Sequence, residues 1–267
     1  MAKLSFASFL LPALVDAASV CDPNRDDYFC IEVGSPKANG STEANYLHDR
    51  QLITRPYTGQ LQKRFSRPLL IPNLWTSPYF GGGAQLLDSD FELNGKPTAK
   101  IVFFGGTIRS QSAKGLSFLT GLCHEVGHFL SDGPRQDFPG SEWSAIEGSA
   151  DFFAAAQCLP KLFSIENQLV RKLKDLDPEV LQFCQGHLLC ANVVQSGLEL
   201  VNMFRENSFD DSVPEVRLRF QEPKAKDLTR GYPNLQCRLE SFLQAGLCLQ
   251  QGRVAACPPP SCWYPSN

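Results

Sequence analysis

Apolar residues recur at intervals of three and four over residues 114–130, and this spacing predicts an amphipathic helix. Gly133 and Pro134 end the pattern, because both residues disfavour helix continuation. Gly127 inside the predicted helix costs about 1 kcal/mol relative to alanine, so we expect a neighbouring element to approach closely there. The apolar positions of this helix are Leu116, Leu119, Cys123, Val126 and Leu130.

Further helices are predicted in the C-terminal half of the chain. One covers residues 144–158 and ends before Pro160. Asp177 and Pro178 then supply an N-cap and a first-turn proline for another helix. Helical periodicity returns over residues 191–206. We therefore expect this half to be mainly helical, with no internal repeat or low-complexity linker dividing the chain.

The N-terminal half has a weaker pattern. Residues 21–84 lack sustained periodicity and contain many prolines and glycines, which predicts an irregular region with one short strand near residues 69–71. Asn94-Gly95 separates two apolar-rich segments, residues 85–93 and 96–108, and this is a strong hairpin signal. The hairpin is either an ordinary core element or an edge that pairs with an extended peptide. The expected fold class is α+β, with a small antiparallel sheet.

Composition narrows the class of protein. The chain has 267 residues, and its 43% apolar content is enough for a genuine core. Its formal net charge is -3 and its pI about 5.8, without a run of Lys or Arg. We therefore expect no nucleic-acid partner and no docking to an anionic membrane.

The N-terminus has the three parts of a secretory signal peptide. Lys3 precedes an apolar run over residues 4–15, and small residues follow at 17–19. The run is too short to span a bilayer, and no later segment approaches about 18 unbroken apolar residues. We expect residues 1–20 to be cleaved, and the mature protein to be secreted or periplasmic without a transmembrane segment.

Ten cysteines in an exported chain favour as many as five disulfides. Their connectivity stays open, but helix geometry excludes one pair. Cys237 and Cys248 would lie about 16 Å apart on one helix, beyond the reach of about 7 Å between bridged Cα atoms. The candidate pairs are Cys21–Cys30, Cys257–Cys262 and the geometrically marginal Cys123–Cys158.

The candidate chemistry lies in the segment His124-Glu125-Val126-Gly127-His128. Histidines four apart project from one helix face, so both imidazoles can reach one metal ion. Glu125 lies beside the open metal position, where a general base is needed. Glu147 on the next predicted helix is the best third ligand, and Asp151, one turn later, can orient a ligand histidine.

Two simpler explanations compete with a metal site. An HExxH segment can arise by chance in an amphipathic helix. Ser144 and Glu147 also form the pattern of a capping box, in which Glu147 would only close a helix N-terminus. Each explanation can account for one of the two segments when that segment is considered alone. Both histidines and the later acidic pair together favour zinc.

The two segments resemble those of gluzincin metallopeptidases, which bind zinc through HExxH on one helix and a glutamate of ExxxD on a later helix. Residues 231–239 are similar to the H-P-x-x-x-x-R-I segment of HtpX-like and CAAX-prenyl-protease peptidases, with Tyr232 in place of the histidine. The resemblance implies a zincin-like catalytic domain over residues 85–267, with a cysteine-rich C-terminal tail. Metzincins do not match, because no third histidine follows shortly after HExxH.

The expected function is a secreted zinc-dependent metalloendopeptidase that acts on a peptide or protein substrate as a monomer. Zn²⁺ polarises the carbonyl and its bound water, and Glu125 transfers the water proton to the leaving amine. The candidates for stabilising the oxyanion are Tyr232 and Arg238, ranked above His187; the alternative for Arg238 is a salt bridge or helix cap. The alternative function is an inactive, exported, disulfide-stabilised zinc-binding or structural protein.

Overall fold

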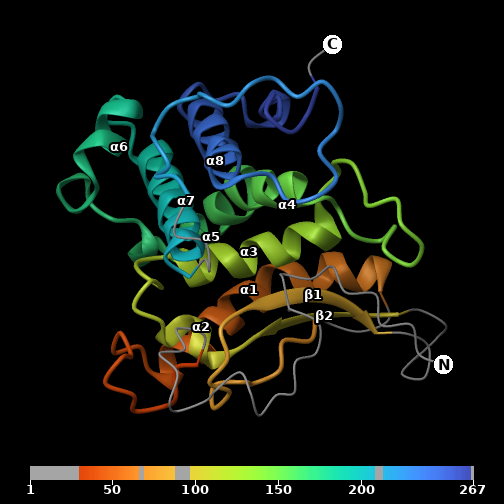
Figure 1. The fold of residues 1–267 in the computed structure, drawn as a ribbon, viewed down its shortest axis with the longest axis vertical. Coiled ribbons are helices and arrows are strands. Elements are labelled where there is room, and N and C mark those ends of the chain that lie inside the picture. Colours follow the sequence, from red (N-terminus) through yellow and green to blue (C-terminus); the bar gives the residue numbers. More distant parts are fainter. Residues whose placement is uncertain (1–29, 66–68, 88–96, 208–212, 266–267) are drawn as a thin grey trace. The chain divides into compact units, whose positions relative to one another are not determined.

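The computed structural model describes residues 30–65, 69–87, 97–207 and 213–265 (Figure 1). The predicted signal peptide, Cys21 and the Asn94-Gly95 turn lie outside these ranges. The described residues form two compact units. The first contains the residues up to Lys114 together with Asp137–Ser144, and the second contains Gly115–Gln136 and the residues from Ala145 onward.

The first unit contains a long helix that the sequence pattern did not predict. Helix α1 spans Glu43–Arg64, within the region predicted to be irregular. It begins with a capping box, in which Thr42 Oγ1 accepts from the Asn45 N–H and the Asn45 side chain accepts from the Thr42 N–H. Pro56 lies inside the helix, and the sequence pattern predicted no helix here because proline disfavours a helix interior. Its buried residues are Tyr46, Leu52, Ile53, Tyr57 and Leu61.

A two-stranded antiparallel sheet follows in the same unit. Strand β1 (Gly82–Leu87) pairs with β2 (Thr98–Phe103), in a register that runs from Gly82↔Phe103 to Leu87↔Thr98. This confirms the antiparallel pair. The second apolar segment, residues 96–108, contains β2 and, directly after it, helix α2 (Gly105–Arg109). Near residues 69–71 the backbone forms a single bridge, from Leu70 to Lys100, instead of a strand.

The second unit is helical, and it carries the predicted chemistry. The α+β class and the helical C-terminal half are thus confirmed. Short 3-10 turns lie at Asn167–Leu169, Leu173–Asp175 and Val254–Ala256. The longer elements are α3 (Ser117–Leu130), α4 (Glu147–Phe153), the π-helix η2 (Ala154–Cys158), α5 (Leu159–Ile165), α6 (Pro178–Phe183), α7 (Leu188–Glu206) and α8 (Leu235–Gln250).

Helix α4 differs from its prediction at both ends. It begins at Glu147 instead of Ser144, and the helical path continues through η2 into α5 instead of ending before Pro160. The proline is accommodated because it lies in the first turn of α5, directly after the π-turn.

Close packing joins the helices of the second unit. At Gly127, a Cβ atom would lie 2.8 Å from the Ala150 carbonyl oxygen, so α3 and α4 cross with their backbones almost in contact. This confirms the close approach expected from the glycine. Helix α3 also contacts α7, and α7 packs along α8. Leu239 and Leu243 of α8 pack with Val194 and Val201 of α7 in one buried core cluster.

Disulfides fasten several of these helices. The marginal Cys123–Cys158 pair is formed, with a Cα–Cα distance of 5.7 Å, and it joins α3 to the end of η2. The predicted Cys257–Cys262 pair is wrong, because each cysteine instead reaches a helix α8 cysteine. Cys30 is also disulfide-bonded, and its predicted partner Cys21 lies outside the described residues. The remaining bonds are Cys184–Cys190, Cys237–Cys262 and Cys248–Cys257. Across the described ranges, no helix is both long and apolar enough to cross a membrane.

Candidate metal centre

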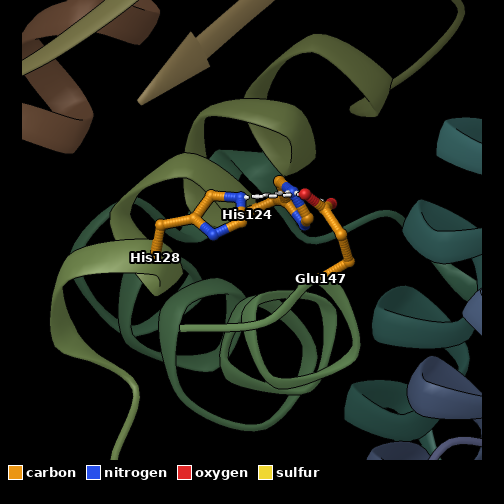
Figure 2. A group of neighbouring side chains, drawn as sticks. All are labelled: His124, His128 and Glu147. Atoms are coloured by element: carbon orange, nitrogen blue, oxygen red, sulfur yellow. Dashed lines mark hydrogen bonds and ion pairs between the residues drawn. The ribbon is translucent and has the colours of Figure 1, made fainter. Parts of the chain in front are cut away.

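Helix α3 brings the two predicted histidine ligands together. His124 and His128 lie one turn apart on the buried face, and their Nε2 atoms are 3.1 Å from each other. Both side chains are almost fully buried. Figure 2 shows the imidazoles and the Glu147 carboxylate pointing toward one another. The i, i+4 spacing therefore produces the convergence that the sequence predicted.

Glu147 reaches the histidines because the chain returns directly against α3. The Ala145 N–H donates to the His128 carbonyl at 2.8 Å, and the Ile146 N–H donates to the Pro134 carbonyl at 3.0 Å. Ile146 has an extended backbone and is the N-cap of α4, without a side-chain cap hydrogen bond. Ser144 does not cap this helix, so the capping-box explanation for Glu147 is wrong.

The spacing of the three side chains suits a tetrahedral metal ion. The Nε2 atom of His124 lies 3.2 Å from Glu147 Oε2, and that of His128 lies 3.7 Å from Glu147 Oε1. Two ligands bound tetrahedrally at about 2.0–2.1 Å, as on zinc, are about 3.3 Å apart. One ligand atom from each residue lies within 4.8 Å of the others. This group could hold a metal ion.

The outer nitrogens of both imidazoles have hydrogen-bond acceptors. His124 Nδ1 lies 2.8 Å from Asp151 Oδ1, and His128 Nδ1 lies 2.8 Å from the Ala145 carbonyl oxygen. The carbonyl can only accept, so His128 Nδ1 carries a proton and, in the neutral ring, its Nε2 lone pair faces the centre. Asp151 favours the same tautomer at His124. Such acceptors orient metal-binding histidines in many proteins.

Arg238 of α8 lies behind Asp151. Its Nε donates to Asp151 Oδ2 and its Nη2 to Asp151 Oδ1, both at 2.8 Å. The side chain is buried, with its guanidinium over the Phe204 ring. The salt-bridge alternative for Arg238 is therefore confirmed. The Arg238 Nη2 atom also lies 3.4 Å from His124 Nδ1, and the predicted role of Arg238 as an oxyanion donor stays a prediction.

The buried side chains of the candidate metal centre carry a net negative formal charge, which favours the binding of a cation. Glu125, Glu147, Asp151 and Arg238 are all nearly inaccessible to solvent. Three carboxylates and one guanidinium leave a formal charge of -2 when both histidines are neutral, and an uncompensated buried charge is costly. A divalent ion balances this charge. The donor set and its electrostatics thus both fit a metal such as zinc.

In the metal-free protein, a proton on His124 compensates part of the negative charge. Burial lowers the pKa of His124, but the Asp151 and Glu147 carboxylates outweigh burial and raise it to about 10. Burial dominates at His128 and lowers its pKa to about 4. For Asp151, burial is outweighed by Arg238 and His124, which lower its pKa to about 2. His124 is therefore the protonated imidazole of the pair at neutral pH.

Glu125 lies beside the three ligands without joining them. Its residue is fully buried on α3, and its Oε2 is 4.0 Å from His128 Nε2. This distance is too long for a hydrogen bond. The carboxylate thus lies next to the candidate metal position, and its role as a general base stays a prediction.

Tyr232 is also brought to the centre, from the segment before α8. Its side chain is half exposed, but its hydroxyl donates a hydrogen bond to the Glu147 carboxylate. Burial, and next the Glu147 and Glu125 carboxylates, raise the pKa of this phenol well above its usual value. The hydroxyl is thus a protonated donor at the mouth of the centre.

The remaining histidines have other places. His187 is the N-cap of α7, where its Nδ1 accepts from the Cys190 N–H at 3.2 Å. It is not among the ligands. His48 is exposed beside Asp49 in the first unit. The ranking of His187 below Tyr232 and Arg238 agrees with its position.

Sequence reasoning missed one backbone group, the Ala145 carbonyl that orients His128. No side-chain motif signals a carbonyl acceptor, because every residue carries one. The similarity of residues 231–239 brought Arg238 into consideration as a site residue, but it did not indicate that the guanidinium pairs with Asp151.

No protein-family model, curated protein or solved structure matches the chain.

Proposed function

We propose that the chain is a zinc-dependent metalloendopeptidase. The observation that carries the proposal is the buried Glu125 carboxylate beside a convergent group of two histidines and one glutamate. Three protein ligands leave the fourth tetrahedral position to water or substrate, which is typical of catalytic zinc and not of closed structural sites. Two imidazoles and a carboxylate also suit zinc chemically.

When bound, zinc would supply Lewis-acid polarisation of a substrate carbonyl and a lowered pKa for a water molecule. The protein side chains do the rest. Glu125 accepts the proton of the attacking water and delivers it to the leaving amine nitrogen, so that the amine departs neutral. Its burial on a helix keeps the carboxylate oriented for both transfers.

Tyr232 is the proposed donor to the developing oxyanion. Its phenol stays protonated because the nearby carboxylates oppose its ionisation. A substrate carbonyl at the centre would accept the hydrogen bond that the hydroxyl donates to Glu147 in this structure. A single donor of this kind contributes about 3–4 kcal/mol of transition-state stabilisation.

Asp151 and Arg238 serve as positioning residues. Asp151 holds the His124 ring by its Nδ1–H, and Arg238 holds both carboxylate oxygens of Asp151. This arrangement keeps the His124 Nε2 atom directed at the metal position. It also raises the basicity of the imidazole as a ligand.

The alternative is an inactive metal-binding protein with the same helices. Glu125 favours the enzyme, because a protein that only binds the metal has no chemical need for a buried carboxylate beside the open position. Burying that charge also carries a free-energy cost. Four disulfides among the described residues are typical of an extracellular or periplasmic protein. They fit the enzyme and the inactive metal-binding protein equally.

Replacement of Glu125 tests the proposal. Glu125→Gln keeps the shape of the side chain and removes its ability to take a proton, so hydrolysis of a peptide library should fall at least about 10²-fold, with zinc content unchanged. Glu179→Gln on the exposed face of α6 is the matched control and should cleave like the unmodified protein. Chelator should abolish cleavage and added zinc should restore it. Zinc binding without cleavage by the unmodified protein would favour the inactive alternative.

A further inference from the structure

Near the C-terminus, Trp263 is fixed to the helix that begins with Glu147. A Cβ atom on Gly148 would lie 2.4 Å from Cδ2 of the indole, so this ring lies directly on the first turn of α4. The indole Nε1–H donates to Ser241 Oγ of α8 at 3.1 Å, and the residue is only 2% exposed. The ring is therefore held by two helices of the metal centre.

The backbone of the same tail holds the segment that carries Tyr232. We call residues 225–233 the tyrosine segment; it has no helix or strand of its own. The Thr229 N–H donates to the Trp263 carbonyl at 3.0 Å, and the Ala225 N–H donates to the Ser261 carbonyl at 2.7 Å. Leu228 packs into the buried cluster formed by Ile146, Cys237 and Trp263.

A second contact ties the tyrosine segment to the histidine helix. The Arg230 guanidinium donates to the Arg135 carbonyl at 2.9 Å. Arg135 in turn donates to the His128 carbonyl at 2.9 Å, at the C-terminal end of α3. Tyr232 follows two residues after Arg230. The tyrosine segment is thus attached on one side to the C-terminal tail and on the other to α3.

We propose that Trp263 is the positioning residue for Tyr232: its indole lies on the Glu147 helix while its carbonyl holds the tyrosine segment. The inference rests on the proposed function where it concerns the rate of peptide hydrolysis. The Cys237–Cys262 disulfide fastens the tail to α8 at the residue before Trp263.

Loss of the Trp263 ring should change the position of Tyr232 and leave metal binding intact, whereas a general loss of structure would change both. The three metal ligands lie on α3 and α4, and Glu125 lies on α3, so loosening the tail should leave metal binding in place. Tyr232 alone should lose its position. The expected kinetic effect is a lower kcat with little change in KM, because a donor to the oxyanion acts mainly in the transition state.

The first arm of the test needs no activity. Hydrogen exchange at the Thr229 amide is measured in the full-length protein, with and without zinc. Trp263→Leu should accelerate this exchange at least about tenfold, because the hydrogen bond to the tail carbonyl is weakened. Trp263→Phe, which keeps a ring on Gly148, should leave most of the protection. Leu228→Ala loosens the same cluster from the other side and replaces Trp263→Leu if that variant does not fold.

Phe242→Leu is the matched control for core damage. Phe242 is a buried aromatic residue of α8 whose ring packs on Gly197 of α7. This variant should lower global stability as Trp263→Leu does, with Thr229 exchange as slow as in the unmodified protein. Zinc affinity should fall by less than the about 10-fold that loss of a ligand-orienting partner costs, because no ligand or ligand-orienting group is removed in any variant. Unchanged Thr229 exchange in Trp263→Leu would overturn the proposal, as would equal acceleration in Phe242→Leu.

The second arm asks whether Trp263 acts through Tyr232. In a double-mutant cycle, Trp263→Leu should lower kcat by a factor close to that of Tyr232→Phe, and should have no further effect when Tyr232 is already phenylalanine. Multiplying losses would overturn the proposal. If the unmodified protein cleaves no peptide, the proposed function fails, and the exchange arm still decides whether Trp263 holds the tyrosine segment.

Discussion

Asp151→Asn is the substitution that probes the centre most directly without touching a metal ligand. In the structure, Asp151 accepts three hydrogen bonds of 2.8 Å, one from His124 and two from Arg238. An asparagine amide group has one accepting oxygen and one donating nitrogen. Its NH₂ group therefore faces either the Arg238 guanidinium or the His124 Nδ1–H, and both are donors.

The expected cost in stability follows from the buried ion pair. Removing one partner of such a pair costs about 3–5 kcal/mol, because the other charge stays buried and uncompensated. The Asp151 pKa is lowered from 3.8 to about 2. This shift means that the surroundings stabilise the charged carboxylate over the neutral acid by about 2 kcal/mol. We expect the free energy of unfolding of the metal-free protein at pH 7 to fall by about 3 kcal/mol.

The expected cost in metal affinity follows from His124. Loss of its carboxylate partner permits the tautomer with the proton on Nε2, which cannot bind a metal. Partners of this kind contribute about 10- to 100-fold to metal affinity. Urea unfolding in the presence of chelator measures the first effect, and competition with a chromophoric zinc chelator measures the second.

A second substitution separates the two effects. Arg238→Met in the Asp151→Asn background removes the uncompensated charge and keeps an apolar stem, so stability should recover while zinc affinity stays low. Recovery of both quantities would show that Asp151 acts through the fold alone. An Asp151→Asn protein with unchanged stability and zinc affinity would refute the role derived from the structure.

Three further outcomes are expected. Purified protein should carry about one zinc per chain, and His128→Ala or Glu147→Ala should remove it, as elemental analysis will show; retention of full affinity by Glu147→Ala would exclude Glu147 as a ligand. Zinc binding at pH 7 should release about one proton from His124, because its metal-free pKa is about 10; affinity should therefore rise with pH up to that value, and calorimetry in buffers of different ionisation enthalpy would contradict this if no proton is released. Thiol titration of the unreduced protein should find at most trace free thiol, since every described cysteine is disulfide-bonded, and several reactive thiols would contradict the disulfides.

The metal ligands were predictable because a helix converts sequence spacing directly into direction. Two histidines four apart must share a face, and the later acidic pair needs only a return of the chain. The start of α4 was less predictable, because the sequence allowed Glu147 to be either a metal ligand or the closing residue of a capping box that begins at Ser144. The observed start at Glu147 depends on the backbone hydrogen bonds of Ala145 to His128 and of Ile146 to Pro134, which are tertiary contacts.

Other features could not be derived from local pattern. Helix α1 contains Pro56, and single-residue propensity counts this proline as an interruption, although burial of one helix face outweighs it. The pairing of Cys237 with Cys262 depends on the path of the C-terminal tail over α8. The place of Arg238 depends on the packing of α8 against α4, which no motif spacing describes.

The Cys123–Cys158 disulfide has a consequence for the order in which the centre is assembled. Cys123 immediately precedes His124, so in a reduced chain a thiolate would stand beside the first imidazole ligand. Thiolates bind zinc strongly, and an unfolded reduced chain would capture the ion in mixed cysteine and histidine complexes. Formation of the Cys123–Cys158 disulfide removes this competing thiolate. If the proposed zinc site is correct, a reduced Cys123 would compete with the imidazoles for the ion, and we expect zinc to load more selectively once this disulfide has formed.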